Sequence, residues 1–310
     1  MRYLNHITLR HLQIFRAVVE KGSFSSAAEH LNLTQPTISL QIKKLSELVG
    51  QPLYVLDGKR IVLTDAGREL VPTSQAIDQS LEDFAMRLDE LQGLKRGHLT
   101  LAAVSSAEYF LPRILGAFCQ RYPQITVSIE ISNRTNILQR LDQRMDDLYI
   151  FGQILSPEQL KADMIEFADN PVVIFAYPEH PLCKKKQIPY ADLSEEPFIL
   201  REAGCGTELL FKKLFQDKNI VLNSRLQLGS NQAVKQAVMG KLGISMLSQY
   251  AILNDVRLNQ LKILDVQGFP TQDKWYLVAP GERRLSIVAT TFQEFLLHEG
   301  RQIMKELLAC

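Results

Sequence analysis

The amino-acid sequence predicts an α/β protein in three parts: an N-terminal winged helix-turn-helix, a long linker helix, and a larger region of two α/β lobes. Residues 1–63 pair two short helices across a tight turn and end in a hairpin. Residues 64–93 place apolar or small side chains every seven positions, as a pairing helix does. Residues 94–310 alternate strands and helices, which is typical of parallel sheets with crossover helices.

The composition is that of a protein with real hydrophobic cores and little overall charge. The chain has 310 residues, 46% hydrophobic content and a net charge of +1, and a prior of about 150 residues per domain suggests two or so domains. No apolar run reaches the roughly 18 residues of a membrane span, and the first residues lack the features of a signal peptide. The cysteines form no CxxC pair, so we expect reduced thiols, a cytoplasmic location and no membrane contact. They are Cys119, Cys183, Cys205 and Cys310.

Three helices and a hairpin are predicted in the N-terminal part. Thr8, Ser23 and Thr34 are good N-caps because their hydroxyl groups can accept an orphan backbone N–H. Asn32, in the turn between the second and third helices, is a candidate for positive φ. The run PLYVLDGKRIVLT then indicates two short strands around Asp57-Gly58. This order of elements defines a winged helix-turn-helix.

The third predicted helix has one apolar face and one face that is polar and partly basic. Ile38, Ile42 and Leu45 share the apolar face at helical period. Leu40 stands on the opposite side, which should meet water. We interpret this helix as one that lies in a DNA major groove, where Leu40 suits a thymine methyl group. The alternative is a three-helix packing module with a solvated face.

The distribution of charge favours the DNA interpretation. Residues 1–62 hold eight Lys or Arg against four Asp or Glu, and residues 64–93 hold two against seven. Hydroxyl and amide groups near the start of the third helix can bond base edges or phosphates, and lysines suit phosphates. The predicted DNA-binding residues are Ser23, Ser25, Thr34, Gln35, Pro36, Thr37, Ser39, Leu40, Lys43, Lys44, Lys59 and Arg60.

The predicted linker helix carries a heptad seam. Its two rows consist of Leu70, Ile77, Phe84 and Leu91, and of Gly67, Ser74, Leu81 and Leu88. Such a seam suits pairing with a second helix, which would make a homodimer with two heads for two DNA half-sites. The alternative is an amphipathic helix packed on its own domain. The segment Gly93 to Gly97 is a predicted hinge.

The C-terminal region is predicted to form two β-α-β units, the second starting near Asn170. In the first unit, the predicted strands span residues 98–104 and 125–131, and the predicted helices span residues 109–122 and 136–144. An amphipathic helix over residues 286–308 is predicted to end the chain.

The stretch SFSSAAEHLNLTQPTISLQIKKLSELVGQPLYVLDGKRIVLTDAG resembles the DNA-binding region of LysR-type transcriptional regulators. The similarity spans most of residues 8–92 and continues in order through the chain. It implies that residues 94–310 form an effector-binding domain like the periplasmic binding proteins. Lobe I would span about 98–168 and 270–310, and lobe II about 169–269. Two departures remove an expected DNA contact: Leu40, where the family often has a polar residue, and Tyr54-Val55-Leu56, where it often has Phe-x-Arg.

Four strand-to-helix junctions of the C-terminal region are rich in small hydroxyl, amide and glycine residues. Ligands of open α/β sheets bind at such junctions, where helix N-termini offer free N–H groups to an anion. Arg134 and Arg201 add charges that can fork onto a carboxylate or phosphate. Each junction alone can equally be a helix cap. The predicted effector-binding residues are Ser105, Ser106, Arg134, Thr135, Asn136, Arg201, Gly204, Cys205, Gly206, Thr207, Asn231 and Gln232.

The amino-acid sequences of these junctions resemble one branch of the family. SSAEYFLPRILGAFCQRYP, SNRTNILQRL, REAGCGTE and LGSNQAVKQAVMGKLGISMLS are similar to the CbbR group of carbon-fixation regulators and its cyanobacterial inorganic-carbon relatives. The resemblance implies a non-enzymatic regulator, without a cofactor, that senses a sugar phosphate, an organic acid or a nicotinamide nucleotide. Its implied partners are a pseudo-palindromic promoter site on double-stranded DNA, RNA polymerase, and a second copy of the chain in a homodimer, with a homotetramer also open.

Cys205 carries the main alternative function. It lies between two glycines before a predicted helix, where a thiolate would be stabilised, so a redox sensor or a thiol enzyme is a second hypothesis. The six histidines show no pattern that would supply a base, and Cys183 is not an obvious resolving cysteine. No Cys/His/Asp spacing suggests a metal site, and GxGxxG after a strand is absent. We expect Cys205 to replace the serine that relatives usually have in this loop.

Overall fold

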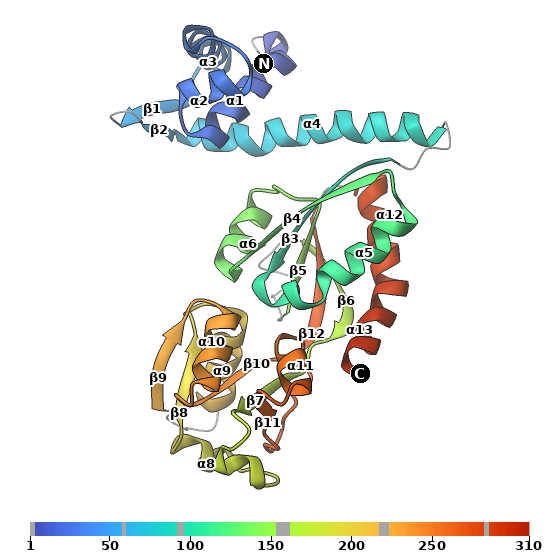
Figure 1. Ribbon diagram of the computed structural model, residues 1–310. Helices are drawn as coiled ribbons and strands as arrows, with labels where there is room; N and C mark the ends of the chain where they lie inside the picture. The colour runs from blue at the N-terminus through green and yellow to red at the C-terminus, as the bar shows by residue number, and fades with distance from the viewer. Residues whose placement is uncertain are drawn as a thin grey trace. The chain divides into compact units, whose positions relative to one another are not determined.

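The structure is a computed structural model that describes residues 4–57, 60–91, 96–152, 162–216, 223–281 and 285–309 (Figure 1). The chain divides into two compact units, the first formed by residues up to Ala85 and the second by most residues from Met86 onward. None of the described helices combines the length and the apolar character needed to cross a membrane.

The first unit is the predicted winged helix-turn-helix followed by a long helix. A 3-10 turn (η1, Leu4–His6) precedes three helices, and an antiparallel two-stranded ribbon follows them. The elements are α1 (Leu9–Lys21), α2 (Phe24–His30), α3 (Gln35–Val49), β1 (Tyr54–Asp57), β2 (Arg60–Leu63) and α4 (Asp65–Leu91).

The predicted caps are confirmed. The hydroxyl groups of Thr8, Ser23 and Thr34 each accept a backbone N–H in the first turn of their helix. Asn32 adopts φ 53°, the left-handed conformation that the turn between α2 and α3 requires. These local signals define where each helix begins, so the three helices can bury their apolar faces in one core.

The first half of α4 packs on its own head. Thr64 caps the helix by accepting the Gly67 N–H at 3.1 Å. Gly67 lies so close to the carbonyl group of Leu53 that a Cβ atom would meet its oxygen at 2.0 Å. Ser74 is fully buried, and Leu70 contacts the head core. For this half, the alternative of an amphipathic helix packed on its own domain is correct.

The second half of α4 presents its seam residues to solvent. Ile77 is 37% exposed, and the exposed fractions of Leu81, Phe84 and Leu88 are 46%, 60% and 44%. The side chain of Leu91 lies outside the described residues. A row of large exposed apolar side chains on one helix is unusual for a surface that stays in water. Pairing through this half of the seam stays a prediction.

The second unit contains two five-stranded sheets, here called lobe I and lobe II. Lobe I has the strand order β4-β3-β5-β12-β6, in which β3, β4 and β5 are parallel and β12 is antiparallel to β5 and β6. The chain therefore returns to lobe I after it has built lobe II. The strands are β3 (Gly97–Val104), β4 (Ile125–Ser132), β5 (Leu148–Phe151), β6 (Ala162–Asp169) and β12 (Lys274–Pro280).

Helices cover both faces of the lobe I sheet (Figure 1). The helices α5, α12 and α13 pack on one face around a fully buried Trp275, and α6 packs on the other against Tyr149 and Phe151. The helical elements are η2 (Ser105–Tyr109), α5 (Leu111–Arg121), α6 (Arg134–Asp142), α12 (Ile287–Phe295), the π-turn η4 (Leu296–Gly300) and α13 (Arg301–Ala309).

Lobe II has the strand order β11-β7-β10-β8-β9 and repeats this layering. One face packs on the aromatic side chains of Phe198, Phe211 and Phe215, and α10 and α11 cover the other face. The strands are β7 (Val172–Ala176), β8 (Pro197–Arg201), β9 (Asn223–Leu228), β10 (Ile244–Ser248) and β11 (Lys262–Ile263). The helical elements are η3 (Pro181–Lys184), α8 (Tyr190–Ser194), α9 (Gly206–Gln216), α10 (Asn231–Met239) and α11 (Gln249–Arg257).

The structure corrects several predicted bounds. The helix expected over 136–144 begins at Arg134, because the side chain of Asn133 caps the Asn136 N–H at 2.9 Å one turn earlier. The helix expected over 109–122 is a 3-10 turn followed by α5, and the last helix is interrupted by the π-turn. Strand β6 was not predicted. Most of the predicted hinge lies outside the described residues.

Candidate functional site: an exposed recognition helix and an interlobe pocket

The outer face of α3 has the composition expected of a nucleic-acid surface. Ile38, Ile42 and Leu45 are at most 1% exposed, whereas Leu40 is 63% exposed in the middle of the opposite face. Lys43 and Lys44 are also exposed, and no ion pair engages them within the described part of the chain. On that face, Gln35 and Pro36 are exposed, and Thr37 and Ser39 are partly so.

Several predicted DNA-binding hydroxyl groups also serve as caps. The Ser23 hydroxyl donates to Ser26 Oγ at 2.9 Å, and the Thr34 and Thr37 hydroxyl oxygens lie 2.8 Å apart. Their oxygens are therefore partly satisfied within the head. Ser25, in the first turn of α2, is exposed.

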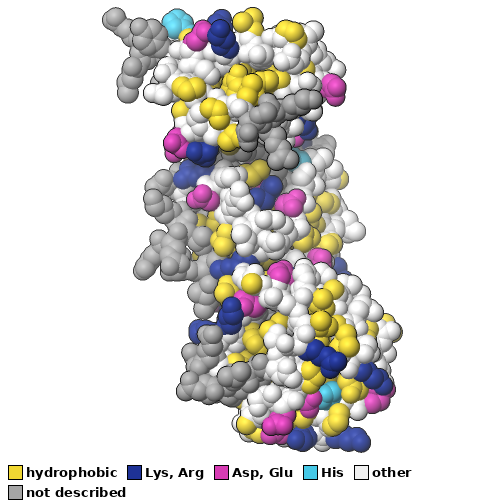
Figure 2. Space-filling view, turned by 90° about the vertical axis from the view of Figure 1, so that its left-hand side faces the viewer, with side chains coloured by type: hydrophobic (Ala, Val, Ile, Leu, Met, Phe, Trp, Pro, Cys, Tyr) yellow, Lys and Arg dark blue, Asp and Glu magenta, His cyan; other side chains and the backbone are white. Residues whose placement is uncertain are grey.

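The described side chains of the ribbon β1–β2 include an exposed apolar group. Val55, Leu56 and Val62 are 52%, 60% and 42% exposed, and Figure 2 shows hydrophobic side chains reaching the surface of this unit, at the top of the view. Lys59 lies outside the described residues, and Arg60 begins β2. An exposed apolar ribbon can contact the sugars and base edges of a groove, and the lysines on the outer face of α3 suit its phosphates.

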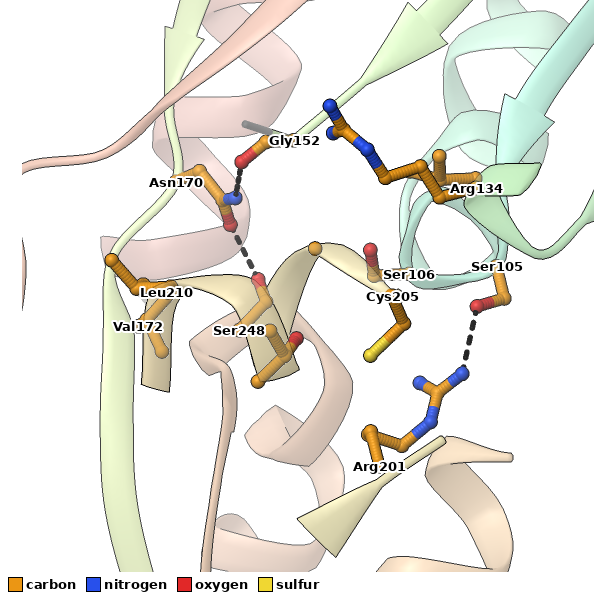
Figure 3. Close-up of a pocket in the computed structure, with 13 residues that line it drawn as sticks. Ser105, Ser106, Arg134, Gly152, Asn170, Val172, Arg201, Cys205, Leu210 and Ser248 are labelled. Atoms are coloured by element: carbon orange, nitrogen blue, oxygen red, sulfur yellow. Dashed lines mark hydrogen bonds between the residues drawn. The ribbon is translucent and has the colours of Figure 1, made fainter. Parts of the chain in front are cut away.

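A pocket lies where the carboxyl ends of the lobe I and lobe II strands face each other (Figure 3). It brings together seven of the predicted effector-binding residues, namely Ser105, Ser106, Arg134, Arg201, Cys205, Gly206 and Thr207. It adds Val104, Gly152, Asn170, Val172, Leu210 and Ser248, which were not predicted. Hydroxyl groups, a helix N-terminus and arginine in one cavity form the donor set that an anion needs.

Asn170 joins the two lobes at the back of the pocket. Its Nδ2 donates to the Gly152 carbonyl of lobe I at 2.8 Å, and the Ser248 hydroxyl of lobe II donates to its Oδ1 at 2.7 Å (Figure 3). Gly152 is required here because a Cβ atom would lie 2.9 Å from Asn170 and 3.0 Å from the Trp275 ring. The Asn-Pro step at 170–171, where the second unit was predicted to begin, was the available sequence signal.

Arg134 is one of the two arginines that line the pocket. It lies at the start of α6, it is only partly exposed, and its guanidinium stands 6.0 Å from the centre of the Phe151 ring. No carboxylate pairs with it among the described residues. Loss of hydration on burial lowers the pKa of Arg134, and the nearby Cys205 offsets this in part. An anion entering the pocket would offset this loss further.

Arg201, in contrast, is fully engaged. Its Nε donates to Oε2 of Glu202 at 2.6 Å and its Nη2 donates to Oε1 at 2.7 Å. Nη1 donates to Oδ1 of Asn231, and Nη2 also reaches the Ser105 hydroxyl of lobe I at 3.4 Å (Figure 3). The charge that was expected to hold an anion is therefore already paired in this structure.

The surroundings of Cys205 do not favour a thiolate. The residue is 7% exposed, and burial raises the pKa of its thiol despite the nearby helix N-terminus and Arg201. The sulfur accepts the Glu208 N–H at 3.4 Å, as an N-cap oxygen would. Burial opposes the stabilised thiolate that the glycine-flanked position suggested, and the replacement of a capping serine accounts for the contacts of Cys205.

The remaining predicted residues lie around the pocket without lining it. Asn231 is buried and holds Arg201, and Gly204 adopts φ 79° and donates its N–H to Glu208 at 3.2 Å. Thr135, Asn136 and Gln232 are exposed. Within the described ranges, no group of three or more His, Cys, Asp or Glu could hold a metal ion.

Fold and site together define a two-part protein, a winged helix-turn-helix head and a two-lobed ligand-pocket domain, and comparison with protein families agrees. Residues 9–68 match "Bacterial regulatory helix-turn-helix protein, lysR family", and residues 92–301 match "LysR substrate binding domain". The chain belongs to the LysR family of bacterial regulatory proteins.

Two curated relatives are similar over nearly the whole chain. The transcriptional activator CmpR of Synechocystis sp. is 42% identical over 293 residues, 94% of this chain and 96% of that protein. A RuBisCO operon transcriptional regulator of Acidithiobacillus ferrooxidans is 44% identical over 293 residues, 94% of each.

Solved structures agree with the fold. The regulatory domain of Synechocystis CcmR in complex with 2-PG is 40% identical, with a TM-score of 0.62 over 65% of this chain and 96% of that one. A full-length OxyR variant of Pseudomonas aeruginosa has a TM-score of 0.72 over 94% of both chains at 18% identity, which shows the fold alone.

Proposed function

We propose that this chain is a DNA-binding transcriptional regulator that responds to a small phosphorylated or carboxylic acid bound between its two lobes. The observation that carries the ligand assignment is Arg134, a partly buried guanidinium without a carboxylate partner among the described residues. The pocket surrounds it with the donors of Ser105, Ser106 and Thr207, which suit phosphate and carboxylate oxygens.

Similarity supports a role in carbon assimilation. The relatives named above include a RuBisCO operon regulator, and the CcmR domain was solved in complex with 2-PG, 2-phosphoglycolate. The cavity volume of the pocket is about 40 Å³, far below the roughly 300–1,000 Å³ of sites for drug-sized ligands. A two- or three-carbon acid phosphate fits it better than a nicotinamide dinucleotide.

The proposed mechanism couples two equilibria in the cytoplasm. The effector contacts both lobes and so favours the closed arrangement by its differential affinity. Asn170 and the segment that it anchors transmit the change in the lobe angle. The resulting rearrangement of a homodimer, or of a homotetramer, alters how paired heads hold a pseudo-palindromic promoter and how RNA polymerase is recruited. No step of this mechanism requires catalysis, and burial of the Cys205 thiol disfavours its nucleophilic thiolate form.

The experiment that tests the proposal uses the full chain. Trp275, the single tryptophan, packs against Gly152 of the pocket, so its fluorescence should report occupancy. We expect a saturable change with 2-phosphoglycolate and a weaker one with NADPH. DNase I footprinting should show a symmetric protected site whose affinity falls steeply with salt. Equal affinity for random DNA, or no response to any small acid, would contradict the proposal.

A further inference from the structure

The second arginine of the pocket is matched by the residue that follows it in the chain. Both oxygens of the Glu202 carboxylate accept hydrogen bonds from Arg201, at 2.6 and 2.7 Å. Two parallel bonds of this kind form the fork that an arginine makes with a bound phosphate or carboxylate. Glu202 therefore makes the same pair of hydrogen bonds with Arg201 that an effector anion would make.

The two partners differ in burial, and this decides which of them can leave. The side chain of Arg201 is 3% exposed and that of Glu202 is 27% exposed. A buried guanidinium is costly without a partner, whereas a carboxylate that already touches water can complete its hydration. If another anion reaches Arg201, Glu202 is the group that can withdraw.

The surroundings allow this exchange by side-chain rotation alone. The Glu202 N–H donates to the Leu228 carbonyl at 3.1 Å, and Gln227 Nε2 donates to the Arg201 carbonyl at 3.1 Å, so the backbone is held on both sides. Asn231 anchors one end of the guanidinium. The other end, Nη2, is directed at Ser105 in the pocket and makes only a long 3.4 Å contact there (Figure 3).

We propose that Glu202 is an internal counter-anion, which holds Arg201 while the pocket is empty and is displaced by the phosphate or carboxylate of the effector. The inference rests on the proposed function and names a residue that determines affinity and selectivity. With Glu202 in place, Arg134 is the pocket arginine that lacks a carboxylate partner among the described residues, which suits a monoanion. With Glu202 displaced, two guanidinium groups face the ligand, which suits a phosphorylated acid.

The test is Glu202→Gln in the full chain, with 2-phosphoglycolate and glycolate as probes and Trp275 fluorescence as the readout. Because the variant removes the competitor, 2-phosphoglycolate should bind about tenfold more tightly, the order of one charge-assisted interaction. Glycolate, which needs only Arg134, should change by less than about threefold. Glu108→Gln removes an exposed carboxylate on η2, beside Ser105, and should leave both affinities unchanged.

A second pair of variants separates exchange from general electrostatics. In an Arg201→Met background, Glu202→Gln should no longer tighten the binding of 2-phosphoglycolate. If Glu202 acted only by repelling the anion through space, the tightening would persist in that background. If Glu202→Gln does not fold, Glu202→Asp keeps the charge but loosens the fork, and it should also bind 2-phosphoglycolate more tightly. Unchanged or weaker binding by a folded variant overturns the exchange. Failure of the wild-type chain to bind either probe would instead overturn the proposed function.

Discussion

Replacing Arg134 by methionine should separate ligand binding from stability. Methionine keeps most of the apolar stem that lies over Phe151 and removes the guanidinium that has no carboxylate partner within the described chain. A charged residue that binds a ligand often lowers the stability of the empty protein, because its charge has lost hydration without gaining a partner. We therefore expect Arg134→Met to abolish the response to 2-phosphoglycolate without weakening the empty domain.

The magnitudes follow from the geometry. Relief of a partly buried, unpaired charge favours the variant by about 1 kcal/mol, and loss of a cation–π contact at 6.0 Å costs about 0.5 kcal/mol. The empty variant should therefore match or slightly exceed the wild type. At a ligand concentration of 100 Kd, binding stabilises the wild type by about 2.7 kcal/mol. For a domain of this size that raises Tm by roughly 5–10 °C.

Thermal unfolding followed by Trp275 fluorescence, with and without 2-phosphoglycolate, measures both quantities. Arg113→Met is the matched control, because Arg113 is exposed on α5 and does not line the pocket; its ligand-induced rise in Tm should equal that of the wild type. A rise in Tm that survives in Arg134→Met would refute the assignment of the anion site. A loss of more than about 1 kcal/mol in the empty variant would show that Arg134 has a structural partner.

Four further predictions concern the head, the seam and the pocket wall. Leu40 is 63% exposed, and if it contacts a thymine methyl group, replacing that thymidine by deoxyuridine in each footprinted half-site should weaken wild-type binding roughly threefold to fourfold, or about 0.8 kcal/mol. The affinity of Leu40→Gln should not change with this replacement. An equal loss of affinity in the variant and the wild type would exclude the contact. Leu81→Glu with Phe84→Glu should convert dimers to monomers in sedimentation, and intact dimers would mean that the seam does not pair. Gly152→Ala should lower the free energy of unfolding measured in urea by about 1–3 kcal/mol, because the new methyl overlaps the Trp275 ring; an unchanged urea midpoint would show that the pocket wall yields freely. Burial and the charge of Lys44 lower the pKa of His11 below 6.5, so the neutral form is favoured on folding; stability should be full above pH 6.5 and decline as pH falls, a dependence that His11→Gln should remove.

The features that could be predicted from the sequence are those that depend on contacts between residues close together in the chain. Thr8, Ser23 and Thr34 cap their helices with groups three residues away, and the apolar faces of α1 and α3 repeat at helical period. These features need no knowledge of the rest of the chain. The winged head could therefore be derived almost completely, including the exposed position of Leu40.

The parts that could not be predicted depend on partners far along the chain. Strand β6 shows no clean alternation, since Phe167 is the one fully buried residue among its eight, and it is defined by pairing with β12 more than 100 residues later. Asn170 and Ser248 line the pocket because the chain crosses between lobes there. The seam of α4 has a uniform heptad pattern, yet its two halves differ because only the first half meets the head.

The sequence also could not predict which of the two pocket arginines is available to a ligand. Arg134 and Arg201 are equivalent in sequence, each at a strand-to-helix junction, and nothing in either junction says which charge is available. Arg201 is paired because the side chain of Glu202 points toward it and because Asn231, 30 positions later, accepts a third hydrogen bond from its guanidinium. Among the described residues, one guanidinium of the pocket lacks a carboxylate partner and the other is paired, so a second charge becomes available to a ligand only when the pair is broken. The affinity of such a pocket for an anion depends on the partner of Arg201 as much as on the number of arginines.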